Sequence, residues 1–393
     1  MTTTINNEHK KLNVPNLRFP EFEGEWEKCT FDKIAQYKKG PFGSALKKDI
    51  FVPQSKDTIK VYEQQNAIKK DWTLSRYYIT KGYFNSHMKQ FVAKAGDLIV
   101  SCAGTIGEIY ELPQDAEEGV FNQALMRVQV NDEAVNKEIF ITVFSSMIDK
   151  FSKIYSNGSA IKNIPPFADL KKTQVFLPCK EEQKKIAKLL VLLDERIATQ
   201  NKIIEDLKKL KSAISEKLFK AVKGDVITLS EICEISKGKQ INGEFLSEKG
   251  KYYVMNGGTE PSGYYNNYNV EANTISISEG GNSCGYVQFN TSPFWSGGHC
   301  YTIQEIADNV DNLYLYHFLK SKEDAIMKLR IGSGLPNIQK KDLAMFKIKI
   351  PTVEQQKAIS TFLSSLERKA EIEERIQNAM QKEKQYLLRQ MFI

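Results

Sequence analysis

An internal repeat most constrains how this chain folds, because a segment that occurs twice must build the same structural unit twice. Residues 30–40 resemble residues 228–238, and each copy ends in a Lys-Gly pair. Residues 158–164 resemble residues 332–338, and the similarity continues, with one extra residue in the first copy, to the end of the chain. The segments between these matches differ in length and sequence. The pattern predicts two modules with a common scaffold and different tasks.

Each copy begins with a globular part that is typical of strands and turns. Residues 97–101, 125–130 and 273–278 alternate apolar and polar side chains between Gly-containing turns, which predicts strands. Residues 133–153 and 309–330 carry apolar residues at helical spacing and are predicted to be helical. We therefore expect an α+β fold with two β-rich α/β modules.

Each copy ends in a long stretch without Gly or Pro, which follows Pro178 or Pro351. A helix of about 40 residues is about 60 Å long and cannot bury an apolar stripe against one small module. We expect the two helices to pack on each other as an antiparallel coiled coil; the alternative is two independent amphipathic helices, each covering its own module. Apolar residues at steps of three, four or seven form the predicted packing faces: Leu190, Leu193, Ile197, Ile204, Leu207, Ile214 and Leu218 in the first helix, and Ile359, Leu363, Leu366, Ile376, Met380 and Leu387 in the second.

Composition limits the classes of protein that remain. The 393 residues include 55 Lys and Arg against 48 Asp and Glu, a net charge of +7, which permits an anionic partner without requiring one. No segment has the roughly 18 consecutive apolar residues of a membrane span, and the polar start lacks the apolar core of a secretion signal. We expect a soluble, cytoplasmic protein without a membrane partner. The six Cys form no CxxC pair, so neither a disulfide framework nor a zinc site is predicted.

One segment approaches a catalytic motif. Residues 163–167 read Asn-Ile-Pro-Pro-Phe, whereas amino-group DNA methyltransferases carry Asn-Pro-Pro-Phe or Asn-Pro-Pro-Tyr. The extra Ile separates the Asn from the prolines, so the Asn side chain and the following carbonyl could not hold the amine of a flipped base. The second copy, residues 337–341, has no proline pair at all. We interpret the segment as a Gly-Ser turn followed by a stretch that docks the module on its helix.

Other motifs of catalysis and cofactor binding are also missing. Residues 104–107 and 280–285 are Gly-rich but lack the spacing of a dinucleotide or phosphate loop, so we expect tight turns between strands. The four His stand apart in the sequence, without a metal-binding or nucleophile motif. His299 is interpreted as a partly buried strand residue. We predict no catalytic residue, no metal and no cofactor bound by this chain.

Recognition of a nucleic acid remains. Phosphate contacts need Lys and Arg, and base edges are read by residues such as Asn, Gln, Ser and Lys. Any one such residue is more often a solvated loop residue, but the same residue types recur after equivalent strands in both copies. The candidates are Lys38, Lys39, Ser44, Lys47, Lys48, Asn66, Lys89, Gln90 and Gln123 in the first copy, and Lys237, Lys239, Gln240, Asn256, Thr259, Tyr264 and Asn282 in the second.

The chain resembles the specificity subunit of Type I restriction-modification systems. Residues 17–26, Leu-Arg-Phe-Pro-Glu-Phe-Glu-Gly-Glu-Trp, are similar to the common start of that family. The order of module, helix, module and helix covers residues 17–393. The family's module opening, which leads to Lys-Gly, and its closing run, Pro followed by Glu-x-Gln-x-x-Ile, each occur twice, at residues 31–40, 229–238, 177–186 and 350–359.

This resemblance implies two target recognition domains, each reading one half of a bipartite site on double-stranded DNA. The domains would be residues 1–177, with an N-terminal extension 1–16, and residues 224–349. Residues 178–223 and 350–393 would be the central and distal conserved helices, which set the spacing and dock two methyltransferase subunits. Restriction and translocation subunits would join the complex. S-adenosylmethionine, ATP and Mg would be bound by these partners, and this chain would be a non-catalytic subunit in defence against foreign DNA.

Two other classes of protein remain open. The first is a DNA-modifying enzyme with fused recognition domains, against which the missing motifs count. The second is a coiled-coil scaffold protein that does not bind DNA. Such a scaffold predicts no dependence of DNA affinity on salt, whereas a DNA-reading protein predicts a steep one.

Overall fold

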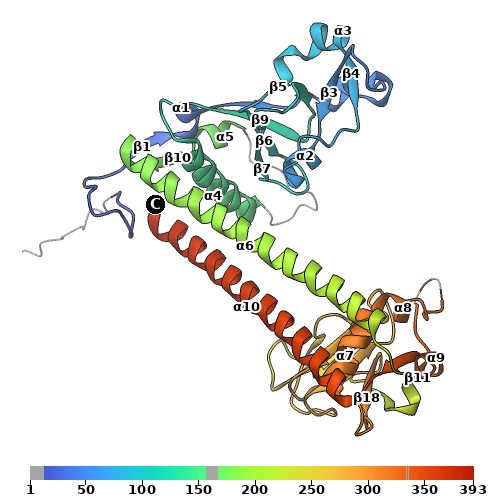
Figure 1. Ribbon diagram of the computed structural model, residues 1–393. Helices are drawn as coiled ribbons and strands as arrows, with labels where there is room; N and C mark the ends of the chain where they lie inside the picture. Colours follow the sequence, from blue (N-terminus) through green and yellow to red (C-terminus); the bar gives the residue numbers. More distant parts are fainter. Residues whose placement is uncertain (1–12, 156–166, 333, 335) are drawn as a thin grey trace, which may run out of the picture. The chain divides into compact units, whose positions relative to one another are not determined.

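The structure is a computed structural model that describes residues 13–155, 167–332, 334 and 336–393. It consists of two compact units, residues 1–197 with 380–393 and residues 198–379. Each unit contains one globular module and a part of both long helices (Figure 1). We call residues 26–177 the first module and residues 224–349 the second module.

The first module is built on two four-stranded sheets. One has the strand order β2-β9-β6-β7 and the other β4-β3-β8-β5, and a separate pair joins β1 to β10. The strands are β1 Glu27–Thr30, β2 Ala35–Lys39, β3 Thr58–Tyr62, β4 Tyr78–Thr80, β5 Val92–Ala93, β6 Leu98–Ser101, β7 Ile109–Glu111, β8 Gly119–Phe121, β9 Leu125–Val130 and β10 Gln174–Leu177. The helices are α1 Phe31–Ile34, α2 Gln64–Lys69, α3 Lys81–Tyr83, α4 Lys137–Tyr155 and α5 Phe167–Lys172.

The second module repeats one of these sheets and replaces the other. Its four-stranded sheet, β12-β18-β15-β16, matches β2-β9-β6-β7 in order and direction, whereas its second sheet has only three strands, β14-β13-β17. The strands are β11 Asp225–Thr228, β12 Glu234–Lys237, β13 Tyr252–Met255, β14 Gly263–Tyr265, β15 Thr274–Ser278, β16 Val287–Asn290, β17 Trp295–Ser296, β18 Cys300–Gln304 and β19 Lys347–Ile350. The helices are α7 Asn312–Ser321, α8 Glu323–Met327 and α9 Lys340–Ala344.

These elements confirm the predicted fold class and the three predicted strands. The helix predicted over residues 133–153 begins later, at Lys137, because Asn136 caps it with its side-chain oxygen on the amide of Glu138 at 2.9 Å. The segment 309–330 forms two short helices, α7 and α8, instead of one. The Gly-rich stretches predicted as turns lie between β6 and β7 and between β15 and β16.

The alternation of side chains along β6 and β15 determines which hydrophobic core each residue joins. In β6, Leu98 and Val100 belong to the core with α4, whereas Ile99 between them belongs to the core with Tyr62 and Phe121 of the other sheet. Successive side chains of a strand point to opposite faces, so both faces of β6 are covered. In β15 the same alternation buries Ile275 and Ile277 on one side and two serines on the other.

The two long helices, α6 Lys180–Ala221 and α10 Val353–Met391, pair antiparallel within each unit. In residues 198–379, Gln200 Nε2 lies 2.6 Å from Glu373 Oε2, and Lys211 Nζ lies 2.7 Å from Glu367 Oε1. In the other unit, Lys384 pairs with Asp194. As residue numbers rise on α6, those of the partners on α10 fall, which excludes two independent helices. Coiled-coil winding stays a prediction.

The predicted packing faces agree with burial except at one residue. Leu190, Ile204 and Leu363 are buried, and the others are half-buried. Ile376 is 39% exposed. It is thus the one residue of the predicted packing faces that is exposed.

A buried glutamine joins each module to its long helix; we call Gln183 and Gln356 the glutamine clamp. Gln356 donates to the carbonyls of Asn309 at 3.0 Å and Pro351 at 2.9 Å, and it accepts from the amide of Asp311, the residue before α7, at 2.7 Å. Gln183 donates to Pro178 at 2.9 Å and accepts from Asn136, the residue before α4, at 2.7 Å. The repeated Glu-x-Gln-x-x-Ile run therefore has a structural reason.

The N-terminal segment ties the first module to the far end of the chain. Arg18 makes a bidentate ion pair with the fully buried Glu182, at 2.8 and 2.7 Å, and the bond to Glu182 raises the pKa of the guanidinium. Trp26 packs edge-on against Phe392 with ring centroids 6.0 Å apart. In the second module, α6 leads directly through residues 222–224 into β11, so no such segment is needed there.

We predict that Gln356→Ala destabilises the protein. The change removes the partner of the buried Pro351 carbonyl and of the part-buried Asp311 amide and Asn309 carbonyl. Each such group costs about 1–3 kcal/mol when it is left unpaired away from water. The free energy of unfolding, measured by urea denaturation, should fall by about 3 kcal/mol or more. The matched control is Gln355→Ala at the exposed neighbouring position. Equal, small losses in both variants would contradict the clamp.

His317 supplies a pH-dependent contribution to stability. It is 2% exposed, and its Nε2 lies 2.9 Å from the hydroxyl of Ser364 on α10. Burial lowers its pKa to about 4, although the nearby Glu367 acts in the opposite direction. The unfolded chain binds the proton near pH 6.5. The unfolded state therefore holds more protons between these values, and stability is lost as pH falls from 6.5 towards 4.

We predict that His317→Gln, which does not titrate, removes this dependence. Between pH 7 and pH 5 the free energy of unfolding of the wild type should fall by about 2 kcal/mol more than that of the variant, measured by denaturant titration at each pH. Parallel curves for the two proteins would show that His317 is not the titrating group.

Candidate nucleic-acid interface

The repeated sheet brings the Lys-Gly pair of each copy to the same place. Lys39 at the end of β2 lies opposite Met126 of β9, and Lys237 at the end of β12 lies opposite Tyr301 of β18. The strand order is the same in both modules, so these lysines occupy matched positions. Each lysine lies beside the turn that leads into β9 or β18.

Glycine is required after each lysine because another backbone passes close to it. A Cβ on Gly40 would lie 1.9 Å from the carbonyl oxygen of Asn122, and one on Gly238 would lie 2.2 Å from that of Gly297. No side chain fits at either position. The Lys-Gly match between the copies therefore preserves a close approach of two turns beside an exposed lysine.

In the first module, the structure brings two predicted residues together. Lys38 donates to Oε1 of Gln90 at 2.8 Å, and its ammonium lies 5.0 Å from the centre of the Phe91 ring. Both polar groups remain on the surface. The other predicted residues that are exposed in this module are Lys39, Ser44, Lys47, Lys48, Lys89 and Gln123.

Asn66 is a correction to the predicted interface. It is 2% exposed, and its side chain is fully engaged. Its oxygen accepts from the amide of Glu63 at 2.8 Å, and its nitrogen donates to the carbonyls of Asp71 at 2.9 Å and Leu74 at 2.8 Å. It caps α2 and fixes the loop that follows, so in this structure its amide serves the fold.

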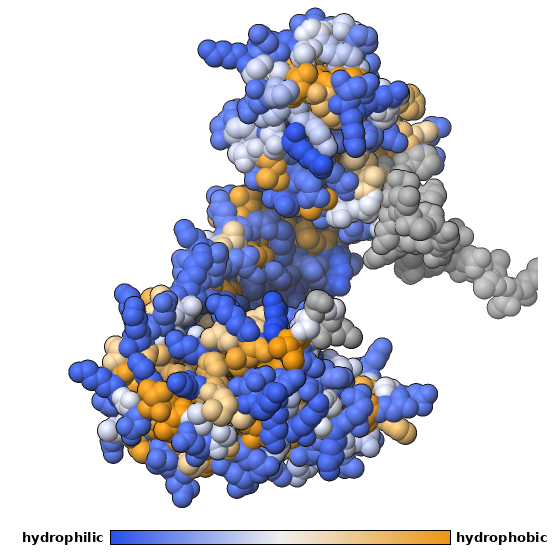
Figure 2. Space-filling view, turned by 90° about the vertical axis from the view of Figure 1, so that its right-hand side faces the viewer, coloured by the Kyte–Doolittle hydropathy of each residue, from blue (hydrophilic) through white to orange (hydrophobic). Residues whose placement is uncertain are grey.

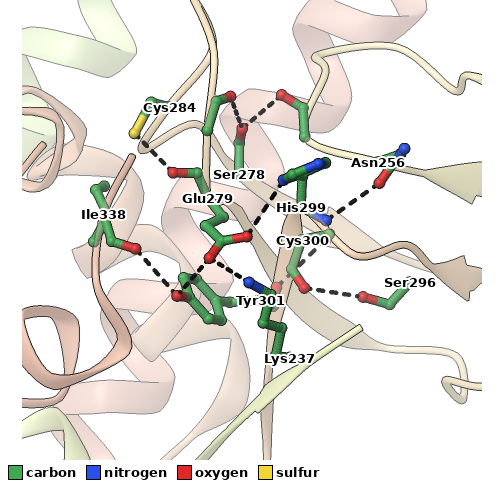
Figure 3. A network of polar contacts seen from close by, with 12 residues as sticks. Lys237, Asn256, Ser278, Glu279, Cys284, Ser296, His299, Cys300, Tyr301 and Ile338 are labelled. Atoms are coloured by element: carbon green, nitrogen blue, oxygen red, sulfur yellow. Dashed lines mark hydrogen bonds and ion pairs between the residues drawn. The ribbon is translucent and has the colours of Figure 1, made fainter. Parts of the chain in front are cut away.

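In the second module, two predicted residues, Lys237 and Asn256, meet at a polar network around Glu279 (Figure 3). Tyr264 is half-buried in β14, whereas four predicted residues are exposed: Lys239, Gln240, Thr259 and Asn282. Most of the predicted residues of this module thus lie in loops, and the polar contacts gather around Glu279, directly after β15.

Glu279 and His299 are central to this network and were not predicted. Oε1 of Glu279 accepts from Lys237 Nζ at 2.6 Å and from the Tyr301 hydroxyl at 3.1 Å. Oε2 is buried without a hydrogen-bond partner among the described residues, and His299 Nδ1 lies 3.5 Å from it. Burial, with the Glu279 charge adding to it, raises the pKa of Tyr301, so the phenol stays a donor.

His299 is not the partly buried strand residue that its sequence position indicated. Its side chain is 64% exposed, in the turn before β18. Its amide donates to Oδ1 of Asn256 at 3.2 Å, and its carbonyl accepts from the amide of Glu279 at 2.9 Å. A signal for Glu279 was present in the sequence: a charged residue directly after the buried, alternating strand β15 and directly before two glycines.

The matched positions of the first module are apolar or small. The amide of Cys102 donates to the carbonyl of Ala124 at 2.8 Å, as that of Glu279 does to His299. Cys102 thus matches Glu279, Ala124 matches His299, and Met126 matches Tyr301. Burial raises the pKa of Cys102 to about 12, so its thiol remains protonated and unreactive at neutral pH.

The described residues contain no group of three or more His, Cys, Asp or Glu that could hold a metal ion. Within the same ranges, no helix is both long and apolar enough to cross a bilayer. The Asn-Ile-Pro-Pro part of the methyltransferase-like segment lies outside the described residues.

Comparisons with known proteins agree with this architecture. A putative type I specificity subunit from Mycoplasma pneumoniae is 35% identical over 139 residues, so the chain matches only 37% of the length of that relative. The putative type I restriction enzyme MjaX specificity subunit from Methanocaldococcus jannaschii is 26% identical over 91% of this chain and 96% of the relative.

Solved structures show the same fold. The S subunit of a Type I restriction-modification system from M. genitalium matches 97% of this chain and 99% of its own length, with a TM-score of 0.60 at 21% identity. A chain from a structure of type I restriction-modification complex assembly and conformational transition has a TM-score of 0.58 at 16% identity. The sequence itself matches the Type I restriction modification DNA specificity domain twice, over residues 23–209 and 222–382. With both modules inside these matches, the chain belongs to the family of Type I restriction-modification specificity subunits.

Proposed function

We propose that this chain is the DNA-reading subunit of a Type I restriction-modification complex, in which each module reads one half of a bipartite target. The observation that carries the proposal is the matched strand end: one scaffold, built twice, presents different side chains at the same positions. Lys39 has Cys102 and Met126 beside it, whereas Lys237 has Glu279 and Tyr301. A common scaffold with different polar groups suits two readers of different sequences.

The surfaces of the modules support contact with DNA. Both modules carry exposed lysines and amides, and these groups suit phosphate oxygens and base edges. On the face drawn in Figure 2, hydrophobic side chains form small groups separated by hydrophilic ones. Such a surface is more typical of a polar, wet interface than of an obligate protein contact.

The long helices carry the proposed contacts with methyltransferase subunits. Ile203 and Leu210 are seven residues apart on α6 and are 40% and 50% exposed. Phe362, Ile372 and Ile376 on α10 are 47%, 46% and 39% exposed. Large apolar side chains on a helix already paired with another helix mark a surface for a further protein. The same helices would set the spacing between the half-sites.

The same proposal assigns different roles to the subunits of the complex. This chain would select the target, and the methyltransferase and restriction subunits would supply the chemistry. S-adenosylmethionine, ATP and Mg would be bound by those partners.

Exchange of one module tests the reading of DNA. Replacing residues 225–345 with the corresponding segment of a specificity subunit of different target should change one half of the recognised sequence and leave the other half as it was. Methylation-sensitive sequencing of DNA from cells that express the hybrid and its methyltransferase partner measures both halves at once. A change in both halves would contradict independent modules.

The salt dependence of binding separates this proposal from a scaffold that does not bind DNA. Affinity should fall steeply between about 50 and 200 mM salt, because bound cations are released from each neutralised phosphate. The purified chain without partners should transfer no methyl group from S-adenosylmethionine to target DNA. Methyl transfer by the chain alone would instead favour a DNA-modifying enzyme with fused recognition domains.

Charged substitutions on α6 test the docking surface. In the double variant Ile203→Asp, Leu210→Asp, burial of two carboxylates in the interface should lower the affinity for the methyltransferase subunit at least about tenfold. Co-purification and titration of the two proteins measure the loss. Ser212→Asp, on another exposed face of α6, is the control. Unchanged affinity in the double variant would place the docking surface elsewhere.

A further inference from the structure

The buried carboxylate of Glu279 has no counterpart in the first module. We propose that Glu279, with Lys237 and His299 around it, reads the exocyclic amino group of one base in the half-site of the second module. The inference rests on the proposed function, because it assigns a base-reading residue to that module. The base class is adenine or cytosine, the two bases that present an amino group in the major groove.

The backbone of Glu279 is held from three directions. Its amide donates to the His299 carbonyl at 2.9 Å, and its carbonyl accepts from the amide of Ile338 at 2.8 Å and from the Cys284 thiol at 3.0 Å. Ser278 fixes the neighbouring loops with bonds to the carbonyls of Gly257 at 2.6 Å and Gly280 at 3.3 Å. A side chain on this backbone is pre-organised, as a reader of hydrogen-bond patterns requires.

The two carboxylate oxygens of Glu279 differ in their hydrogen bonds. Lys237 and Tyr301 both bind Oε1. Among the described residues Oε2 is buried without a hydrogen bond, with the ring nitrogen of His299 3.5 Å away, and the side chain is only 10% exposed. A buried oxygen without a partner is unfavourable for the free protein. An amino group from outside would supply the missing donor, and the free state is therefore prepared for such a ligand.

Folding does not require a carboxylate at this position. The same sheet forms in the first module with Cys102, Ala124 and Met126 at the positions of Glu279, His299 and Tyr301. An apolar set thus satisfies the scaffold, and burying an ionised group instead is costly. The polar set in the second module serves something other than the fold.

The groups around Oε2 reach the surface. His299 is 64% exposed and Lys237 is 50% exposed, and Figure 3 shows both directed at the Glu279 carboxylate. A base whose amino group displaced His299 from Oε2 would meet an acceptor flanked by two donors. Adenine offers a donor and an acceptor side by side on this edge, and cytosine offers the donor.

The other two bases are disfavoured by the same geometry. Guanine and thymine present carbonyl oxygens at the corresponding place in the major groove. A carboxylate has no proton to donate to them, and its negative charge repels them. Glu279 therefore discriminates by attraction and by repulsion at one position of the target.

Selection from a random duplex library tests the assignment with the full chain and its methyltransferase subunits. The wild type should select a bipartite motif. Glu279→Gln should relax the discrimination at one position of the second half-site, because an amide can donate to the carbonyl oxygens of guanine and thymine as well as accept from an amino group. It should leave the first half-site unchanged. Glu248→Gln, at an exposed glutamate of the same module, is the matched control and should select the wild-type motif.

A base analogue identifies the contact. At the affected position, purine replaces adenine, or 2-pyrimidinone replaces cytosine, so that only the exocyclic amino group is lost. Wild-type affinity should fall roughly 10- to 100-fold. On the analogue, Glu279→Gln and the wild type should bind with similar affinity, because no exocyclic amino group is left for either side chain to accept from. The same analogue placed in the first half-site should affect both proteins equally.

The outcomes separate this inference from the proposed function. A wild-type motif that Glu279→Gln leaves unchanged would overturn the inference alone. Equal loss of preference at every position would assign Glu279 a structural role and also overturn it. If Glu279→Gln fails to fold, His299→Ala at the exposed turn should alter the preference at the same single position, and no change there would be decisive against the inference. If the wild type selects no motif, the proposed function fails as well.

Discussion

The glutamine clamp is the interaction on which the arrangement of each unit depends. Gln183 and Gln356 are buried at the first turn of α6 and α10, where backbone groups lack partners within the helix. Each side chain satisfies a carbonyl before its own helix and the amide of the residue before α4 or α7. A single amide group thus fixes the direction in which a long helix leaves its module. Because the groups are backbone atoms, the loops nearby are free to differ in sequence.

The two modules reach the same helix contacts by different routes. In the second module, α6 continues through Gly224 into β11, and no side chain fits at that glycine because a Cβ would lie 2.4 Å from the Ile350 carbonyl oxygen. In the first module, the corresponding helix end belongs to α10, so the junction is non-covalent. Met391 enters the core, the amide of Leu17 donates to the Gln390 carbonyl at 2.9 Å, and Arg18 anchors the segment on Glu182. This explains why the first module, whose helix junction is non-covalent, has the Arg18–Glu182 pair.

The spacing of apolar residues in the sequence was sufficient to predict the fold but not the residues of the site. The repeat, the strands around β6 and β15, and the two long helices follow from spacing alone, since burial of an amphipathic face imposes the period. Asn66 was predicted at the interface because the sequence does not distinguish an Asn that caps a helix from an Asn that reads a base. Ile376 follows the apolar spacing but is exposed. Glu279 and His299 are 20 residues apart in the chain, and only the pairing of β15 with β18 brings them together.

The position of Glu279 shows how such a scaffold changes what it reads without changing how it folds. The inward side chains of the central strands, Val100 in one copy and Ile277 in the other, stay apolar, so the core is indifferent to the residue just beyond the strand end. A carboxylate there still needs donors within reach. Lys237 is matched by Lys39, but the Tyr301 hydroxyl is matched by the Met126 side chain, which donates nothing. A glutamate in place of Cys102 would therefore lack the donors that Tyr301 and His299 supply, since Met126 and Ala124 stand at their positions. The polar network of the second module thus depends on residues from several strand ends.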